Sequence, residues 1–415
     1  MSYSQNEGLL FGSTVPKIND RNLKIAEVVH GLYLPTRIAF LGLNDILVIE
    51  KNNGTVNRII NGTILDHPLL DVNVANQEER GLVGIAVSKN EAGTYVFLYY
   101  TEAESKDDGK VLGNRLYRYE FMNDKLVDPR LLLDLPATPG PFHNGGAITI
   151  GPDGYVYVSV GDFSSCKFTT VISSCETFRT KAENYEGGHE PDGRAGILRV
   201  TQDGQTVGHG ILGASHPLDK YYAYGIRNSF GIDFDPVTGK LWDTENGPDY
   251  GDEINIVYPG FNSGWAKVAG IWKTNGSSAG NVMLVPRHLE DFDRKGIYRP
   301  PEFTWRNTIG PTAITFVNSD KLGKEYQNDI LVGDVNTGRL YHFDLNEQRT
   351  GFNLKGQLAD KIADTHGETK GIVFGHDFGE VTDIKVGPDG FVYVVVFSQQ
   401  YGKILKIEPR YNDNQ

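Results

Sequence analysis

The chain has 415 residues, of which 39% are hydrophobic and 22% charged, so it has enough apolar material for a folded core. Its formal net charge is −13 and it has no run of Lys or Arg, which disfavours nucleic acid or an anionic membrane as a partner. No apolar stretch approaches the roughly 18 residues that a membrane helix needs. Glycine accounts for 49 of the 415 residues, a larger share than the usual value of about 7%, which favours short strands joined by tight turns.

Two features bear on the compartment. The first residues, MSYSQNEGLL, lack a charged n-region and an apolar h-region, so we expect no signal peptide in this sequence. Cys166 and Cys175 lie in one polar segment, and two thiols are too few for a structural zinc site. We interpret them as a local disulfide, with two free thiols as the alternative. A disulfide implies an oxidising compartment, so we expect a secreted, periplasmic or cell-surface protein.

One pattern recurs six times along the chain: an alternating strand, a turn rich in Gly, Asp, Asn or Pro, and an apolar strand. An isoleucine marks the first strand of each copy: Ile38, Ile85, Ile148, Ile232, Ile314 and Ile384. The insertions between copies vary in length. We therefore predict an all-β fold, a six-bladed β-propeller of four-stranded antiparallel blades. It would form one domain over residues 1–415, with the blades at roughly 30–410. The competing repeat fold, a β-helix, is disfavoured because its repeats are far shorter than these.

Propeller sites lie at the mouth of the central channel, so polar residues beside the first strands are the candidates. His143 precedes the first strand of blade three, and Asp162 follows the next strand. Antiparallel neighbours could bring the two side chains together. A carboxylate on one imidazole nitrogen makes the other nitrogen a better base. The alternatives are a structural histidine and an aspartate that caps a turn.

Arg227 and Asn228 occupy the corresponding position in blade four. An arginine there could pair with a carboxylate or stabilise negative charge that develops on a carbonyl oxygen. The alternative is a structural arginine that bridges blades.

The segment TENGPDYGDEINIV concentrates acidic side chains around a Gly-Pro turn. Carboxylates and exposed carbonyls are the hard oxygen ligands that Ca²⁺ prefers, although such a segment is more often a solvated surface. The acidic residues are Glu245, Asp249, Asp252 and Glu253, and the turn is Gly247-Pro248.

Taken in order, several segments resemble the glucose/sorbosone dehydrogenase family over roughly residues 30–410. They are EERGLVGIAV, HNGGAITIGPDGYVYVSVGD, GRAGILRV, YAYGIRNSFGIDFDPVTGKLW and ENGPDYGDEINIVYPGFNSGW. The best-known members are soluble quinoprotein glucose and aldose sugar dehydrogenases. The resemblance implies a six-bladed propeller that holds pyrroloquinoline quinone (PQQ) and Ca²⁺ in its central cleft. It also implies that an aldose is oxidised at its anomeric carbon to a lactone, with the electrons passing to an external acceptor.

By that resemblance, His143 is the general base and Asp162 orients it. Arg227 and Asn228 contact the quinone oxygens and stabilise the reduced form. The carbonyls of Gly247 and Pro248 ligate Ca²⁺. The acidic segment adds Asp252 and Glu253 as further metal candidates and could hold a second Ca²⁺, which makes a homodimer possible. The remaining candidate contacts of the cofactor are Thr308 and Asn336.

The sequence departs from the quinoprotein members where they hold the cofactor's three carboxylates. A lysine of blade five is matched by Asn336, and two arginines of blade six are matched by Glu380 and Thr382. A glutamine of blade two is replaced in the segment that holds Glu79 and Arg80. Lost cations oppose the binding of a trianion, because each charge-assisted hydrogen bond to a carboxylate contributes about 1.5–3 kcal/mol.

Two other functions therefore stay open. One is a metal-dependent lactonase, which would act without quinone. The other is a non-catalytic or sugar-binding propeller, which would show neither quinone affinity nor turnover. A nicotinamide-dependent dehydrogenase is disfavoured because no Gly-x-Gly-x-x-Gly opens a helix after a strand.

Overall fold

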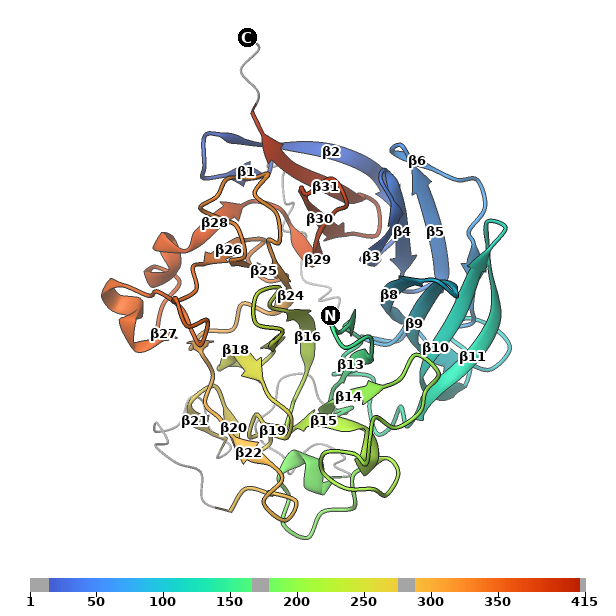
Figure 1. Cartoon of the computed structure of the whole chain (residues 1–415), viewed down its shortest axis with the longest axis vertical. Helices are drawn as coiled ribbons and strands as arrows, with labels where there is room; N and C mark the ends of the chain where they lie inside the picture. The colour runs from blue at the N-terminus through green and yellow to red at the C-terminus, as the bar shows by residue number, and fades with distance from the viewer. Residues whose placement is uncertain (1–14, 166–178, 275–287, 411–415) are drawn as a thin grey trace.

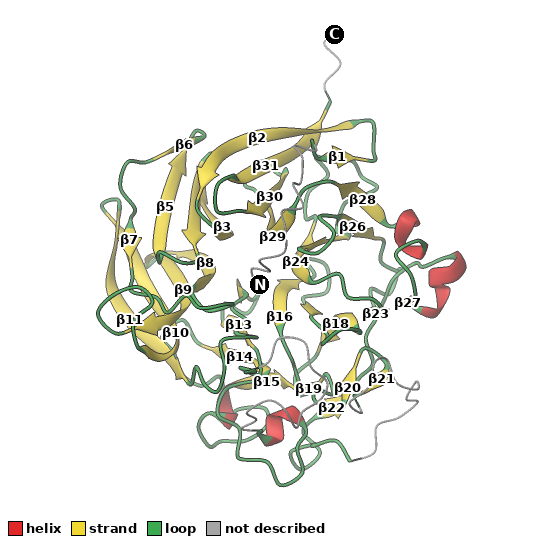
Figure 2. Ribbon diagram, turned by 180° about the vertical axis from the view of Figure 1, so that it is seen from behind, coloured by secondary structure: helices red, strands yellow, loops and turns green. Residues whose placement is uncertain are grey.

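The computed structural model describes residues 15–165, 179–274 and 288–410. Strands dominate this part of the chain and form sheets arranged around a common centre (Figure 1). The described helices are short 3₁₀ helices at the periphery (Figure 2): η2 (Lys181–Glu183), η3 (Leu218–Lys220), η4 (Gly356–Asp360) and η5 (Glu368–Gly371). Within the described residues, no helix has the length and apolar character needed to cross a membrane.

Six strands form an inner ring, and each carries one of the isoleucines that mark the sequence repeat. Each ring strand contacts the next, and the last contacts the first, so the ring is closed. In order, they are β3 (Pro35–Gly42), β8 (Leu82–Asn90), β12 (Ile148–Ile150), β16 (Ser229–Phe234), β24 (Pro311–Phe316) and β29 (Glu380–Val386). All six isoleucines are buried, as expected where sheets pack face to face around a centre.

Each ring strand begins a sheet that runs outward through antiparallel neighbours. The first three sheets continue through β4 (Asp45–Glu50), β5 (Thr55–Ile60), β6 (Thr63–Ile64) and β7 (Leu70–Asp71); through β9 (Gly93–Ala103), β10 (Val111–Met122) and β11 (Lys125–Leu135); and through β13 (Val156–Val160), β14 (Gly196–Val200) and β15 (Tyr221–Tyr224). The other three continue through β17 (Leu241–Glu245) and β18 (Asp252–Val257); through β25 (Ile330–Asp334), β26 (Leu340–Phe343) and β28 (Val373–His376); and through β30 (Val392–Phe397) and β31 (Gly402–Pro409).

The β-propeller expectation is confirmed, but the expectation of six uniform four-stranded blades is wrong, because the sheets have between four and six strands. The extra strands are short segments, from the irregular insertions and from the start of the described chain, that pair with the outer part of a blade and satisfy its exposed backbone groups. These segments are β1 (Lys17–Ile18), β7, β19 (Phe261–Asn262), β22 (Ile297–Tyr298) and β27 (Ile362–Ala363), whereas β23 (Phe303–Trp305) is the fourth strand of the sheet that begins with β16. A separate ribbon joins β20 (Val268–Ala269) and β21 (Trp272–Lys273).

The two ends of the described chain close the ring. The long strand β2 (Leu23–Leu32) pairs with β31 and becomes the outermost strand of the last blade, with Ile25 opposite Ile407. The hydrophobic core lies between neighbouring blades. For example, Val83 of β8 packs in one cluster with Ile148 and Val158 of the next blade.

Three threonines, each two residues before a marker isoleucine, tie blades together at the inner ring. Each hydroxyl donates to a backbone carbonyl of the following blade. The bonds run from Thr36 to Leu82, from Thr312 to Val381 and from Thr382 to Pro35. The ring therefore has hydrogen bonds between blades as well as within them.

Replacing Thr36 by valine should lower the free energy of unfolding by about 1 kcal/mol, because a buried hydrogen bond is lost while the side-chain volume is kept. Urea denaturation measures the change. The matched control is Thr63→Val, which alters an exposed threonine of β6. An equal loss in the two variants would show that the bond between blades contributes nothing.

Candidate functional site

His143 and Asp162 form a buried pair at one end of the inner ring. His143 lies just before β12 and Asp162 just after β13, and these antiparallel strands place imidazole Nδ1 2.7 Å from carboxylate Oδ1. Because a carboxylate accepts, Nδ1 carries the hydrogen and Nε2 carries the lone pair. His143 has a φ of 59°, in the left-handed region. The arrangement is that of an oriented base.

Asp162 is held by two side chains that sequence reasoning missed. Its Oδ2 accepts from Trp265 Nε1 at 2.7 Å and from Arg179 Nη1 at 3.3 Å. Arg179 also donates to Glu183 at 2.6 Å, so Asp162 and Glu183 share one guanidinium. Trp265 and Arg179 follow Asp162 by about 100 and 17 residues in the chain, and no local spacing marks either of them.

Burial alone would raise the pKa of Asp162, but its interactions with His143, which include a hydrogen bond, and then with the charges of Arg179 and Arg227 hold that pKa well below its usual range. A carboxylate whose folded-state pKa lies below its unfolded value of about 3.9 stabilises the fold above that pH and loses this contribution as the pH falls. Asp162 should therefore contribute stability at neutral pH that disappears in acid.

In Asp162→Asn, the neutral amide removes the charge, and if its oxygen still accepts from Trp265 and Arg179, its NH₂ group cannot accept from His143 Nδ1. We expect the melting temperature to fall clearly below wild type at about pH 7, and the difference to shrink towards about pH 3. Thermal unfolding across this range, with Asp66→Asn as an exposed control, measures the effect. A difference that is constant with pH would contradict the assigned ionisation.

Arg227 and Asn228 precede β16 as His143 precedes β12, so corresponding positions of adjacent blades meet. The Arg227 guanidinium lies 5.4 Å from the ring of Trp265 and donates to the carbonyl of Asn246 at 2.9 Å. The same tryptophan thus contacts Arg227 and Asp162. Both predicted residues are buried beside the His143 pair.

Glu79 joins this group from blade two. Its Oε2 accepts from the backbone N–H of His143 at 2.7 Å and from the side-chain amide of Asn228 at 3.2 Å. The sequence marked Glu79 only as a departure from the family. In the structure it connects the loops before three ring strands.

The Gly247-Pro248 turn is shaped by Asp252. One carboxylate oxygen of Asp252 accepts from Gly247 N at 2.8 Å, and the other accepts from Ile309 N and Gly310 N at 2.6 and 2.9 Å. Among the described residues, no donor is directed at the carbonyl oxygens of Gly247 and Pro248. These two carbonyls are therefore the part of the predicted metal site that is open to a cation.

The predicted side-chain ligands are engaged within the fold. Glu253 is buried and accepts from Ser263 Oγ at 3.2 Å and from Asn255 Nδ2 at 3.1 Å. In the described ranges, no three His, Cys, Asp or Glu side chains are grouped so that they could hold a metal. Asp249 is exposed. Asp252 and Glu253 thus position the turn and its strand.

Thr308 and Asn336 come from neighbouring loops that contact each other. Thr308 is half-buried in the loop before β24, and the exposed Asn336 donates its backbone N–H to the neighbouring Ile309 carbonyl at 3.2 Å. No described contact joins either residue to His143 or Asp162. The predicted disulfide, Cys166 to Cys175, lies outside the described residues.

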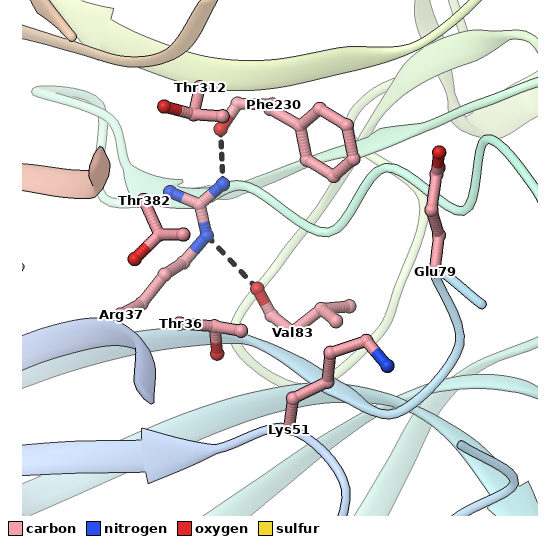
Figure 3. A pocket seen from close by; sticks show the side chains of 8 residues that line it. All are labelled: Thr36, Arg37, Lys51, Glu79, Val83, Phe230, Thr312 and Thr382. Atoms are coloured by element: carbon pink, nitrogen blue, oxygen red, sulfur yellow. Dashed lines mark hydrogen bonds between the residues drawn. The ribbon is translucent and has the colours of Figure 1, made fainter. Parts of the chain in front are cut away.

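Beneath this group, the centre of the ring holds a cavity of about 40 Å³ (Figure 3). Arg37 of β3 reaches across it and donates to the carbonyls of Val83 and Phe230, which belong to two other blades. Its Nη1 lies 3.5 Å from a carboxylate oxygen of Asp383. The cavity is lined by Thr36, Arg37, Lys51, Glu79, Val83, Phe230, Thr312 and Thr382.

The sequence pattern of the family described as "Glucose / Sorbosone dehydrogenase" matches residues 32–406. The chain belongs to this family. The match covers nearly the whole chain and includes all of the ordered segments that suggested the family from the sequence.

Three proteins are similar to this chain over most of its length. An uncharacterised protein of Synechocystis is 27% identical over 95% of this chain and 88% of its own length. Quinoprotein glucose dehydrogenase B of Acinetobacter calcoaceticus is 26% identical over 74% and 68% of the two chains. The structure of the soluble aldose sugar dehydrogenase of Escherichia coli, in its apo-form, has a TM-score of 0.69 at 21% identity and covers 94% of this chain and 100% of its own.

Proposed function

We propose that the chain is a PQQ- and Ca²⁺-dependent sugar dehydrogenase that oxidises the anomeric carbon of an aldose to a lactone. Membership of the family and the activity named for its quinoprotein relative support oxidation of a sugar. The observation that carries the proposal is the His143–Asp162 pair beside Arg227, because it combines an oriented base with a buried cation. The same geometry alone would serve other proton transfers, so the family supplies the reaction class.

The residues fit the reacting side of the cofactor. The carbonyls of Gly247 and Pro248 form a pair of hard oxygen ligands without described donors, which suits Ca²⁺. Arg227 and Asn228 supply N–H groups that would bind the quinone oxygens. When bound, the quinone would supply the site's acceptor of a hydride, which carries the two electrons of the oxidation.

The protein's own contribution begins at His143. Asp162 fixes the ring through Nδ1, so Nε2 can take the proton from the anomeric hydroxyl of the sugar. As that O–H bond breaks, a C=O bond forms at the anomeric carbon, and the hydrogen on this carbon leaves with its electron pair. Asp162 stabilises the imidazolium that results. Trp265 and Arg179 keep the carboxylate in place during this change of charge.

The partners under this proposal are an aldose and an external electron acceptor. We also propose that the protein is exported, because a disulfide between Cys166 and Cys175 would persist only in an oxidising compartment. Fractionation of producing cells, followed by thiol labelling with and without reductant, tests both points. Unprotected thiols in a cytoplasmic protein would contradict them.

The test of the function is reconstitution. The purified protein is titrated with PQQ and Ca²⁺, and reduction of a redox dye is followed with a panel of aldoses. We expect saturable, sugar-dependent dye reduction that a chelator abolishes. Quinone-independent hydrolysis of a lactone would support the lactonase. Sugar binding without quinone affinity or turnover would support the binding propeller.

A further inference from the structure

Two cationic side chains of blade one line the cavity beneath the candidate site. Arg37 comes from β3, and Lys51 directly follows β4. Figure 3 shows both side chains around the same space, with Glu79 on the opposite side of Lys51 from Arg37. Because Glu79 contacts His143 and Asn228, the cavity adjoins the group proposed to act on the sugar.

The two cations differ in how far their charge is already compensated. Arg37 is paired with the buried Asp383 and donates to two carbonyls, so its charge serves the fold. Lys51 is also buried, but its ammonium donates only to uncharged groups among the described residues, Asn52 Oδ1 at 2.8 Å and Asn76 O at 3.2 Å. An ammonium has three N–H groups, so Lys51 can donate to a further acceptor.

Burial lowers the pKa of Lys51 to about 8, and the nearby carboxylates of Glu79 and Glu78 oppose that lowering. Lys51 is therefore mostly charged at neutral pH. A cation held in a buried position gains more from a bound anion than an exposed one does, since water screens it less.

The cavity is large enough for one small charged group. Its volume of about 40 Å³ corresponds to about three water-sized groups, which suits the two oxygens of a carboxylate and excludes an aromatic ring. Any larger ligand must place its body outside the cavity, towards Glu79 and the residues that it contacts.

We propose that this cavity is a carboxylate-binding subsite, with Lys51 as its cation and Glu79 as the internal carboxylate that competes with the ligand for it. The inference rests on the proposed function, in which the ligand is a tricarboxylate cofactor. It also accounts for a departure noted in the sequence. Thr382, which stands where a cation was expected, lines the same cavity, so the charge comes from blade one instead of blade six.

The test measures binding without turnover. Two probes are used: PQQ, followed by its fluorescence, and benzene-1,3,5-tricarboxylate, followed by calorimetry. Lys51→Met should weaken both by about 10-fold or more, as expected for the loss of a charge-assisted hydrogen bond. Lys51→Arg should keep most of the affinity. Glu79→Gln removes the competing charge but can still accept from His143 and Asn228, so it should tighten binding of both probes.

The matched control is Lys220→Met, which removes a similarly buried lysine from η3, just before β15. It should leave both affinities unchanged. If Lys51→Met, folded as judged by its melting temperature, binds both probes like wild type, the subsite is overturned while the sugar dehydrogenase proposal stands. If PQQ does not bind the wild-type protein but the simple tricarboxylate binds through Lys51, the subsite stands and the cofactor proposal falls. Weaker binding in Glu79→Gln would overturn the competing role of Glu79.

Discussion

His143→Gln should reduce the turnover number of the reconstituted protein by about 10²- to 10⁴-fold, the range that a general base contributes. Glutamine can still donate an amide hydrogen towards Asp162, so the loop should keep its shape, but it has no basic nitrogen for the sugar's proton. The dissociation constant for PQQ should change less than about threefold, because no contact proposed for the quinone involves the ring. Steady-state kinetics and PQQ titration measure the two quantities separately.

The control for this variant is His30→Gln, which replaces an exposed histidine of β2. It should leave turnover and binding unchanged. Turnover in His143→Gln that equals the wild-type value would remove His143 from the mechanism. A loss of PQQ binding that matches the loss of turnover would instead assign His143 to cofactor binding.

Arg37→Met should lower the free energy of unfolding by about 3–5 kcal/mol, as is typical when one partner of a buried ion pair is removed. The variant loses donors to Val83 O and Phe230 O and leaves the Asp383 carboxylate buried without its cation. These contacts link β3 to three other blades, so the closed ring itself is weakened. Urea denaturation, with Arg130→Met as a control on an exposed pair, measures the change.

Adding Asp383→Asn to Arg37→Met should restore part of the lost stability, since the second change removes the uncompensated charge while an oxygen can still accept from Ile38 N. No recovery in the double variant would mean that the lost carbonyl contacts, and not the unpaired Asp383 carboxylate, account for the loss of stability. A loss no larger than that of Arg130→Met would contradict the bridging role of Arg37.

Much of the fold could be predicted because the repeat is local. Each marker isoleucine sits in a short apolar strand, and the structure places all six strands in the inner ring. The extra edge strands could not be predicted, since two-residue segments such as β19 and β22 have no periodicity of their own and form only against an existing sheet edge.

The candidate site was predictable to the same extent. His143 and Asp162 flank one hairpin, so antiparallel pairing alone suggested their contact. Trp265 and Lys51 reach their positions through the closure of the ring, and no sequence spacing encodes that closure. In the sequence, Glu79 looked like a simple loss of a cofactor contact. Its bonds to His143 and Asn228 could not be foreseen, because they join three blades.

The central claim is that the chain oxidises the anomeric carbon of an aldose. The most direct measurement is ¹³C NMR of an aldose labelled at that carbon, incubated with the reconstituted protein and an electron acceptor. We predict that the label moves from the anomeric region to that of a lactone or carboxylate carbon, in amounts matching the acceptor reduced. An unchanged anomeric signal for every aldose that the protein binds, with PQQ and Ca²⁺ present, would contradict the account.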